Sequence, residues 1–171
     1  RTVECISKIT NDFELIYVDD GSPDNSYKKS LELRENEPKL KILKFSRNFG
    51  HHRAVYAGLS HASGDYVFLI DSDLQEEPEL LQEFYEYMKK NPELDSVYGV
   101  EKDRNSNFKD KIAQLYYSFF NFLSDYAYQE NNLMTVRLMK KNLVKAFISH
   151  KDKELYLAPV LSLSGFNQQS I

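Results

Sequence analysis

Short apolar runs alternate with amphipathic segments along the first hundred residues of the chain. The apolar runs are rich in β-branched and aromatic residues, and most of them stop at a cluster of polar residues, which is typical of buried strands. The predicted strands span residues 13–18, 40–45, 66–70 and 96–100.

Segments with helical character separate these strands. Residues 26–37 end before Pro38, residues 51–61 are rich in small side chains, and a third helix begins near Pro78, a residue favoured in the first turn. The third helix has one apolar face, made of Leu80, Leu81, Phe84, Tyr87 and Met88. This alternation predicts an α/β fold in which helices cover a mostly parallel sheet.

The second half of the chain has a weaker pattern. Residues 101–111 are charged, and residues 112–123 predict a helix with a wide aromatic and aliphatic face. Residues 131–148 predict a strand or loop that runs into a helix, whereas residues 155–171 fit helix and strand equally well.

Composition places the chain among globular domains. Its 171 residues, 42% of them hydrophobic, suffice for one domain with a buried core. The net charge of −4 argues against a nucleic-acid-binding module, and the lone Cys5 excludes an internal disulfide and fits a reducing compartment. No apolar run approaches the roughly 18 to 20 residues of a spanning helix, and we expect no secretory signal, since no apolar stretch of the signal type follows Arg1. Since the first residue is Arg1 rather than Met, we expect a piece of a longer or processed protein.

Polar residues follow three of the predicted strands at the point where each ends. The three clusters are Asp19-Asp20, Ser46-Arg47-Asn48 and Asp71-Ser72-Asp73. Because ligands bind outside the carboxyl ends of the strands in such sheets, we expect all three clusters to line one edge.

Asp71 and Asp73 are the clearest candidates for chemistry. Two carboxylates one residue apart repel each other unless a cation lies between them, and Mg²⁺ or Mn²⁺ commonly takes one or two carboxylates together with substrate phosphates. The alternative is an acidic turn at the start of a helix, where the helix dipole favours negative charge. The position after a buried strand and the two flanking clusters favour the metal.

The other polar residues allow two interpretations each. Asp19 and Asp20 can accept hydrogen bonds from a base or ribose, although Asp-Gly and Ser-Pro also form simple turns. The planar guanidinium of Arg47 suits a phosphate, but the residue is equally an ordinary surface arginine. His51 and His52 lie at a helix start, where surface or packing roles are favoured over metal binding.

Three stretches of the sequence carry a family resemblance. The chain resembles the family-2 glycosyltransferases of the GT-A fold in these stretches. They are, in chain order, VDDGSPDNS, FSRNFGHHRAVYAGLSHASGDYVFLIDSDLQEEPELL, and VYGVEKDR with the aromatic helix that follows it. Within that family they are most similar to the polyprenyl-phosphate glycosyltransferases, a group that includes the dolichol-phosphate mannosyltransferases. The resemblance covers roughly residues 3–148. It implies a single Rossmann-like GT-A domain over residues 1–171, truncated at both ends and lacking the family's first strand, whose loop of the type P-x-Y-N-E helps bind the nucleotide.

The resemblance also implies roles for single residues. Residues 1–100 become the nucleotide-sugar-binding half and residues 101–171 the acceptor-side half. In the first half, Asp19 or Asp20 contacts the base, and the metal binds Asp71 and Asp73. The residues implied to bind the nucleotide sugar are Asp19, Asp20, Arg47, Asp71, Ser72 and Asp73. The residues implied to act in catalysis are Asp73, Gln75 and Arg104. Arg47 and Arg104 are also candidates for holding phosphates.

The sequence departs from the family pattern at three places. Neither the basic loop nor the membrane helices that often follow the family's catalytic domain lie within these 171 residues, as we expect of a truncated domain. Thr135 stands where a segment of the type G-D-F-R-L has an aspartate, and Glu101 stands where a basic residue is common. A sugar hydroxyl acceptor needs a general base, whereas a lipid phosphate is already anionic. The absence of the aspartate therefore favours a phosphate acceptor, although a divergent, inactive protein also fits.

Together these features predict a function. We expect an inverting, metal-dependent hexosyltransferase that uses Mg²⁺ or Mn²⁺, a UDP- or GDP-sugar donor and a polyprenyl-phosphate acceptor, in the cytoplasm at the inner face of the membrane. The aromatic helix with Lys102, Arg104, Lys109 and Lys111 suits an anionic membrane surface, but it suits a core helix or the subunit interface of a homo-oligomer equally well. The alternatives are transfer to a saccharide hydroxyl, and a non-catalytic fragment or interaction domain that keeps the fold.

Overall fold

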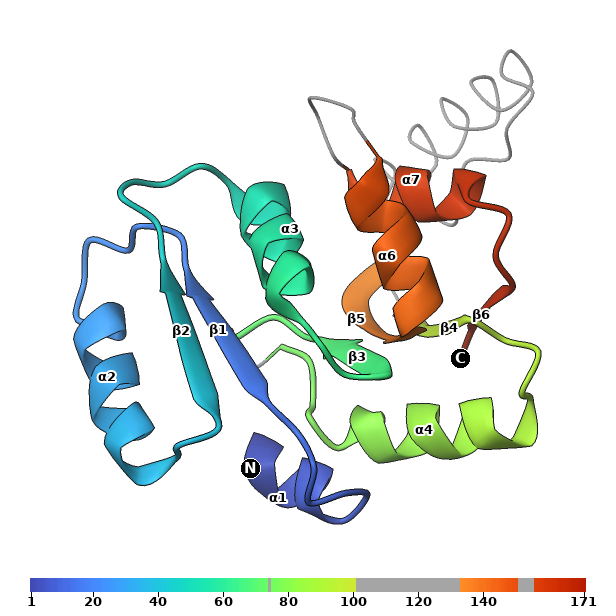
Figure 1. The fold of residues 1–171 in the computed structure, drawn as a ribbon, viewed down its shortest axis with the longest axis horizontal. Coiled ribbons are helices and arrows are strands. Elements are labelled where there is room, and N and C mark those ends of the chain that lie inside the picture. The colour runs from blue at the N-terminus through green and yellow to red at the C-terminus, as the bar shows by residue number, and fades with distance from the viewer. Residues whose placement is uncertain (74, 101–132, 151–155) are drawn as a thin grey trace, which may run out of the picture.

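The computed structural model describes residues 1–73, 75–100, 133–150 and 156–171. Figure 1 shows how its helices and strands are arranged. In chain order they are α1 (Thr2–Ser7), β1 (Leu15–Asp19), α2 (Ser26–Asn36), β2 (Leu40–Lys44), α3 (His51–His61), β3 (Tyr66–Leu69), α4 (Leu80–Lys90), β4 (Ser96–Val100), β5 (Leu133–Lys140), α6 (Lys141–Ser149), α7 (Leu157–Leu163) and β6 (Gln168–Ser170).

The elements predicted from the hydrophobic pattern are confirmed in the first hundred residues. Helix α3 and strand β4 have the predicted limits, and the other elements agree within two residues. The ambiguous segments of the second half are now assigned. Strand β5 runs directly into α6, and the end of the chain forms a short helix followed by a strand. Helix α1 was not predicted, because its six residues show too little of the helical period.

The strands form two separate sheets in the described part of the chain. β1 and β2 pair in parallel, from Leu15 opposite Leu40 to Asp19 opposite Lys44. The second sheet has the order β3-β5-β4-β6, in which β5 runs antiparallel between β3 and β4, and β6 is parallel to β4. Since β3 and β4 both run opposite to β5, their carboxyl ends lie at the edge where β5 begins.

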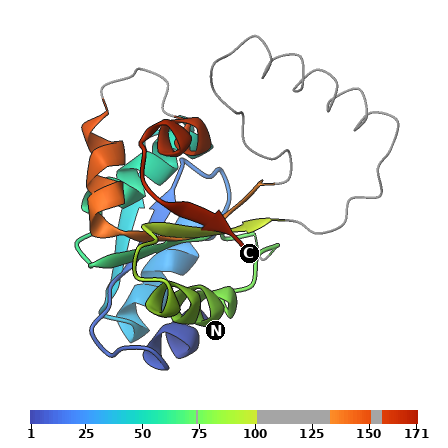
Figure 2. The same cartoon turned by 90° about the vertical axis from the view of Figure 1, so that its right-hand side faces the viewer.

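Helices cover both faces of the four-stranded sheet, as Figure 2 shows. Successive side chains of β5 point to opposite faces. Val136 and Leu138 belong to the cluster around α4, whereas Met139 belongs to the cluster around α3, α6 and α7. All three of these β5 side chains are at most 1% exposed. Strand β5, which the sequence predicted only as a strand or a loop, therefore lies at the centre of the core.

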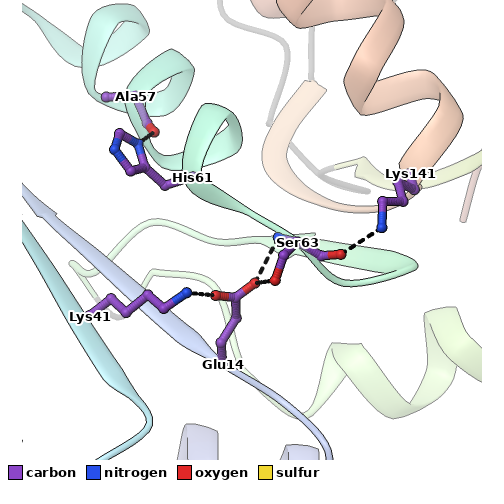
Figure 3. Close-up of polar contacts among 6 residues, drawn as sticks. All are labelled: Glu14, Lys41, Ala57, His61, Ser63 and Lys141. Atoms are coloured by element: carbon purple, nitrogen blue, oxygen red, sulfur yellow. Dashed lines mark hydrogen bonds and ion pairs between the residues drawn. The ribbon is translucent and has the colours of Figure 1, made fainter.

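The amino ends of the two sheets are connected through one carboxylate. Glu14, which precedes β1, accepts hydrogen bonds from the backbone N–H and the hydroxyl of Ser63, both at 2.7 Å, and forms an ion pair with Lys41 on β2 at 2.6 Å. Lys141, at the start of α6, donates to the Ser63 carbonyl at 2.8 Å (Figure 3). We call these four residues the Glu14 cluster. Because Ser63 precedes β3, the cluster connects the edges where β1 and β3 begin.

None of the helices in the described residues has both the length and the apolar character that a membrane span requires.

Candidate functional site

The loops after β1 and β2 are in close contact at the carboxyl edge of the sheet. The two carboxylate oxygens of Asp20 accept hydrogen bonds from the backbone N–H groups of Phe49, at 2.7 Å, and Gly50, at 2.9 Å. Gly21 has a φ of +69°, and a Cβ there would lie 2.4 Å from the carbonyl carbon of Arg47. Only glycine fits this position, because a side chain would collide with rigid backbone. Asp20 and Gly21 thus bring two of the predicted polar clusters together.

Asp19 lies behind this contact and is almost completely buried, at 1% exposure. Its Oδ1 accepts the Ser22 backbone N–H at 3.0 Å, which closes the turn after β1. Its Oδ2 is buried and has no hydrogen-bond partner among the described residues. A buried carboxylate oxygen without a donor is costly, which makes Asp19 an unusual residue for a purely structural turn.

The third cluster joins the same edge through His51. His51 Nδ1, in the first turn of α3, lies 3.7 Å from Asp71 Oδ1, and the side chains are 50% and 36% exposed. His52 packs its ring against Tyr156 at 4.7 Å between centroids. Burial, together with the neighbouring His51, lowers the pKa of His52, which favours a neutral ring at neutral pH. The expectation that the three clusters line one edge is confirmed.

Asp71 and Asp73 provide a donor set that suits a hard divalent cation. Both side chains reach solvent, and Asp73 Oδ1 accepts the backbone N–H of Gln75 at 3.0 Å, which fixes the turn. In the described ranges, no three His, Cys, Asp or Glu side chains gather closely enough to form a metal cage. One or two carboxylates are what Mg²⁺ or Mn²⁺ takes when a substrate phosphate and water supply the other ligands. The residues present therefore fit such an ion.

The remaining predicted donor-side residues lie at or near this edge. Arg47 is exposed, and its guanidinium lies over the ring of Phe49, with 4.7 Å between the guanidinium carbon and the ring centroid. Ser72 and Gln75 are both exposed in the turn that follows β3. This placement leaves Arg47 available to an anionic ligand that reaches the edge.

Glu76 also lies at this site, although nothing in its local sequence distinguishes it. It is only 6% exposed, and its carboxylate accepts the backbone N–H of Asp71 at 3.2 Å and that of Val136 at 2.8 Å. It therefore connects the turn of the two aspartates with β5. In sequence, Glu76 is one of several acidic residues before a helix, and only its burial distinguishes it.

The acceptor-side residues are described only in part. Thr135, in β5, is half-buried beside Val136, so the position where the family has an aspartate lies next to the Glu76 contact. The predictions for Arg104, Glu101 and the aromatic helix at 112–123 lie outside the described residues.

Solved structures of low sequence identity share the fold. A mannosyltransferase of Pyrobaculum calidifontis, PcManGT, solved in complex with GDP-Man and Mn²⁺, matches with a TM-score of 0.64 and 16% identity over 99% of this chain and 49% of that one. TarS of Staphylococcus aureus matches with a TM-score of 0.60 and 18% identity over 99% of this chain and 52% of that one. The expected GT-A fold is confirmed by these neighbours.

Relatives of higher identity carry related descriptions. A protein of Mycobacterium tuberculosis described as "Putative glycosyltransferases" is 43% identical over 98% of this chain and 49% of its own length. The "Prophage bactoprenol glucosyl transferase homolog" of Escherichia coli is 29% identical over 89% of this chain and 49% of its own length. The chain thus spans about half the length of these curated relatives.

The family assignment rests on a match over most of the chain. The sequence model of "Glycosyl transferase family 2" matches residues 1–150. These residues include every described side chain of the carboxyl edge, from Asp19 to Val136. With the fold and the relatives in agreement, the resemblance seen in the sequence is confirmed, and the chain belongs to glycosyl transferase family 2.

Proposed function

We propose that this chain contains the donor site of an inverting, metal-dependent hexosyltransferase that moves a sugar from a UDP- or GDP-sugar to a polyprenyl phosphate at the cytoplasmic face of the membrane. The observation that carries the proposal is the convergence at one edge. Asp20 contacts the residues that precede α3, His51 lies beside Asp71, and Glu76 connects Asp71 with β5.

The donor nucleotide would bind along this edge. Asp20 is partly exposed, and each of its oxygens keeps a free lone pair, so it is the better placed of the two aspartates to receive N–H groups of a base. Arg47 would hold the diphosphate through its planar fork. Asp71 and Asp73 would hold the divalent ion, which offsets the charge that develops on the departing nucleoside diphosphate. PcManGT, which shares the fold, was solved with GDP-Man and Mn²⁺, and this supports both the donor class and the ion.

The relatives and the chemistry of the site both favour a lipid phosphate as acceptor. Bactoprenol glucosyl transferases are among the relatives, including one of Shigella phage SfV at 30% identity. An acceptor phosphate oxygen would form the new bond to the anomeric carbon as the bond to the donor diphosphate breaks, with inversion and with no proton to remove. Thr135 cannot act as a base, and Glu76 is only 6% exposed and holds two backbone N–H groups, so it does not face an acceptor hydroxyl. The described part of this site therefore suits an acceptor that needs no base.

A transfer assay tests the proposal. The intact protein is incubated with Mn²⁺, a UDP- or GDP-sugar, and either a short soluble prenyl phosphate or a saccharide. We expect glycosylated prenyl phosphate, and we expect none with Asp73→Asn. The matched control is Asp65→Asn, which changes an aspartate that is 92% exposed near the amino end of β3 and should leave transfer unchanged.

The other outcomes separate the alternatives. Transfer to the saccharide alone would favour the hydroxyl acceptor and require a base elsewhere in the protein. Absence of both transfer and donor hydrolysis, in protein that is folded, would favour a non-catalytic domain.

A further inference from the structure

Glu76 connects two segments that are far apart in sequence through a single buried carboxylate. Its Oε2 accepts the N–H of Asp71, five residues before it, at 3.2 Å. Its Oε1 accepts the N–H of Val136, sixty residues after it, at 2.8 Å. We call this pair of hydrogen bonds the Glu76 bridge. Because each oxygen accepts from a different segment, the bridge fixes the distance between Val136 in β5 and the turn after β3.

The bridge is too buried to be an ordinary surface contact. Glu76 is 6% exposed, and a buried carboxylate needs donors and a nearby positive charge. Arg137, which is 3% exposed, follows Val136 and donates its Nε–H to the Thr135 carbonyl at 3.3 Å. Burial lowers the pKa of Arg137 to about 10, against the opposing influence of Tyr98 and Glu76, so the guanidinium stays charged at neutral pH.

The positive charge acts on Glu76 without direct contact. Among the described residues, no ion pair of 4.0 Å or less joins Arg137 to Glu76, and the two charges interact at longer range, where Glu76 raises the pKa of Arg137 against the effect of burial. A Glu that needed only a counter-ion would pair with that arginine directly. The carboxylate of Glu76 instead divides its oxygens between two backbone groups, which is the arrangement expected of a residue that sets a distance.

We propose that Glu76 is a positioning residue, which holds the Asp71–Asp73 turn at a fixed place relative to Thr135 and so couples the donor site to the acceptor side. The proposal rests on the function proposed above. Partners outside the direct ligand set orient metal ligands, and their loss commonly weakens metal binding by about 10- to 100-fold. Glu76 would act in this way through the backbone of Asp71 rather than through its carboxylate.

Three variants of the intact protein test the role. Glu76→Gln keeps the size of the side chain, but its amide nitrogen cannot accept, so one of the two N–H groups loses its partner. Glu76→Asp keeps the charge and is one methylene too short to reach both segments. Glu77→Gln makes the same chemical change at the exposed neighbour and serves as the matched control.

Two measurements are made on each protein. Calorimetry gives the Kd of a nucleoside diphosphate with and without Mn²⁺, and amide hydrogen exchange in the metal-free protein follows the N–H groups of Asp71 and Val136. For Glu76→Gln and Glu76→Asp we expect faster exchange of at least one of these amides and Mn²⁺-dependent binding that is about 10- to 100-fold weaker. Glu77→Gln should match the wild type in both. If Glu76→Gln does not fold, Glu76→Asp decides the result.

Two different results would overturn the inference. If the wild type needs Mn²⁺ for binding but Glu76→Gln and Glu76→Asp bind as tightly as Glu77→Gln, then Glu76 stabilises the fold and has no positioning role, even if the melting temperature falls. If the wild type binds the nucleotide equally well with and without Mn²⁺, the proposed metal site fails and the positioning role fails with it. The second result is recognised in the wild type alone, before any variant is compared.

Discussion

Glu14 and Asp71 lie at opposite edges of the sheets and have very different surroundings. Glu14, before β1, accepts two hydrogen bonds from Ser63 and forms an ion pair with Lys41, so both of its oxygens are engaged. Asp71, after β3, has one possible ion-pair partner within 4.0 Å in the described part of the chain, the ring of His51, whose Nδ1 lies 3.7 Å from Asp71 Oδ1. Asp19, at the same edge as Asp71, has a buried oxygen with no described partner.

We interpret this difference as one between residues that stabilise the fold and residues of the proposed donor site. Fully satisfied polar groups at the amino edge connect the two sheets. Incompletely satisfied carboxylates at the carboxyl edge leave lone pairs for a cation or for N–H donors, at some cost in stability. Substitutions at the two edges should therefore have opposite effects on stability and binding.

The largest effect is expected from Asp73→Asn. If Asp73 holds the ion as proposed, its loss should lower sugar transfer by at least about 100-fold, because the charge on the leaving diphosphate is no longer offset. Asp73 is exposed, so the free energy of unfolding should change by less than about 0.5 kcal/mol. Initial rates and urea unfolding of the same preparation measure both quantities. A large loss of stability with sugar transfer retained would show that Asp73 stabilises the fold and does not serve the donor site.

Glu14→Gln should give the opposite result. It removes the ion pair with Lys41, because an amide nitrogen cannot accept, and it takes the charge from the two Ser63 contacts, which the amide oxygen can keep. The free energy of unfolding should fall by about 2 kcal/mol. Nucleotide affinity should stay at the wild-type value, because the cluster lies at the other edge. Urea unfolding measures the free energy of unfolding, and calorimetry measures the nucleotide Kd. A loss of affinity in fully folded protein would show that the two edges do not act independently.

The pH dependence of the free energy of unfolding below pH 5 tests the role of the Glu14 charge. Burial alone would raise the pKa of this carboxyl, but the hydrogen bonds from Lys41 and Ser63 together outweigh burial and lower it from 4.5 to about 2. A depressed pKa in the folded state means that the stabilisation is complete above pH 4.5 and is lost as the pH falls towards 2. The unfolding free energies of wild type and Glu14→Gln should therefore converge between pH 5 and about 2. Parallel curves over that range would show that the charge of Glu14 contributes nothing.

The smallest effect is expected from Asp19→Asn. The amide keeps an oxygen for the Ser22 N–H and removes a buried negative charge that lacks a described partner, so stability should rise by about 1 kcal/mol. Thermal unfolding of the nucleotide-free protein measures the change. A loss of stability would show that the charged Oδ2 is already satisfied in solution.

Most of the fold was predictable because the pattern of the first hundred residues is local. Strand β4 and helix α3 follow directly from their apolar periods and from the residues that flank them. The sequence did not decide whether residues 131–140 form a strand or a loop, because the charged Arg137 interrupts the apolar pattern. In the structure Arg137 is buried in spite of its charge. The antiparallel insertion of β5 between β3 and β4 depends on pairing over long sequence distances, which no local pattern contains.

The site was predictable where residue type alone carries the chemistry. Asp71 and Asp73 stand out in sequence because two carboxylates directly follow an apolar run. Glu76 does not, because its importance comes from burial and from a contact with Val136, sixty residues away. Glu14 was missed for the same reason, since its partners Ser63 and Lys41 come from separate segments.

The most direct test of the donor site is a calorimetric titration of the intact protein with UDP and GDP, in Mn²⁺ and in chelator. We expect one of the two nucleotides to bind in Mn²⁺ and chelator to abolish the binding. Asp73→Asn should also abolish it, whereas Glu14→Gln should not. Equal affinity in Mn²⁺ and in chelator, or full binding by Asp73→Asn, would contradict the assignment of the carboxyl edge as a metal-dependent donor site.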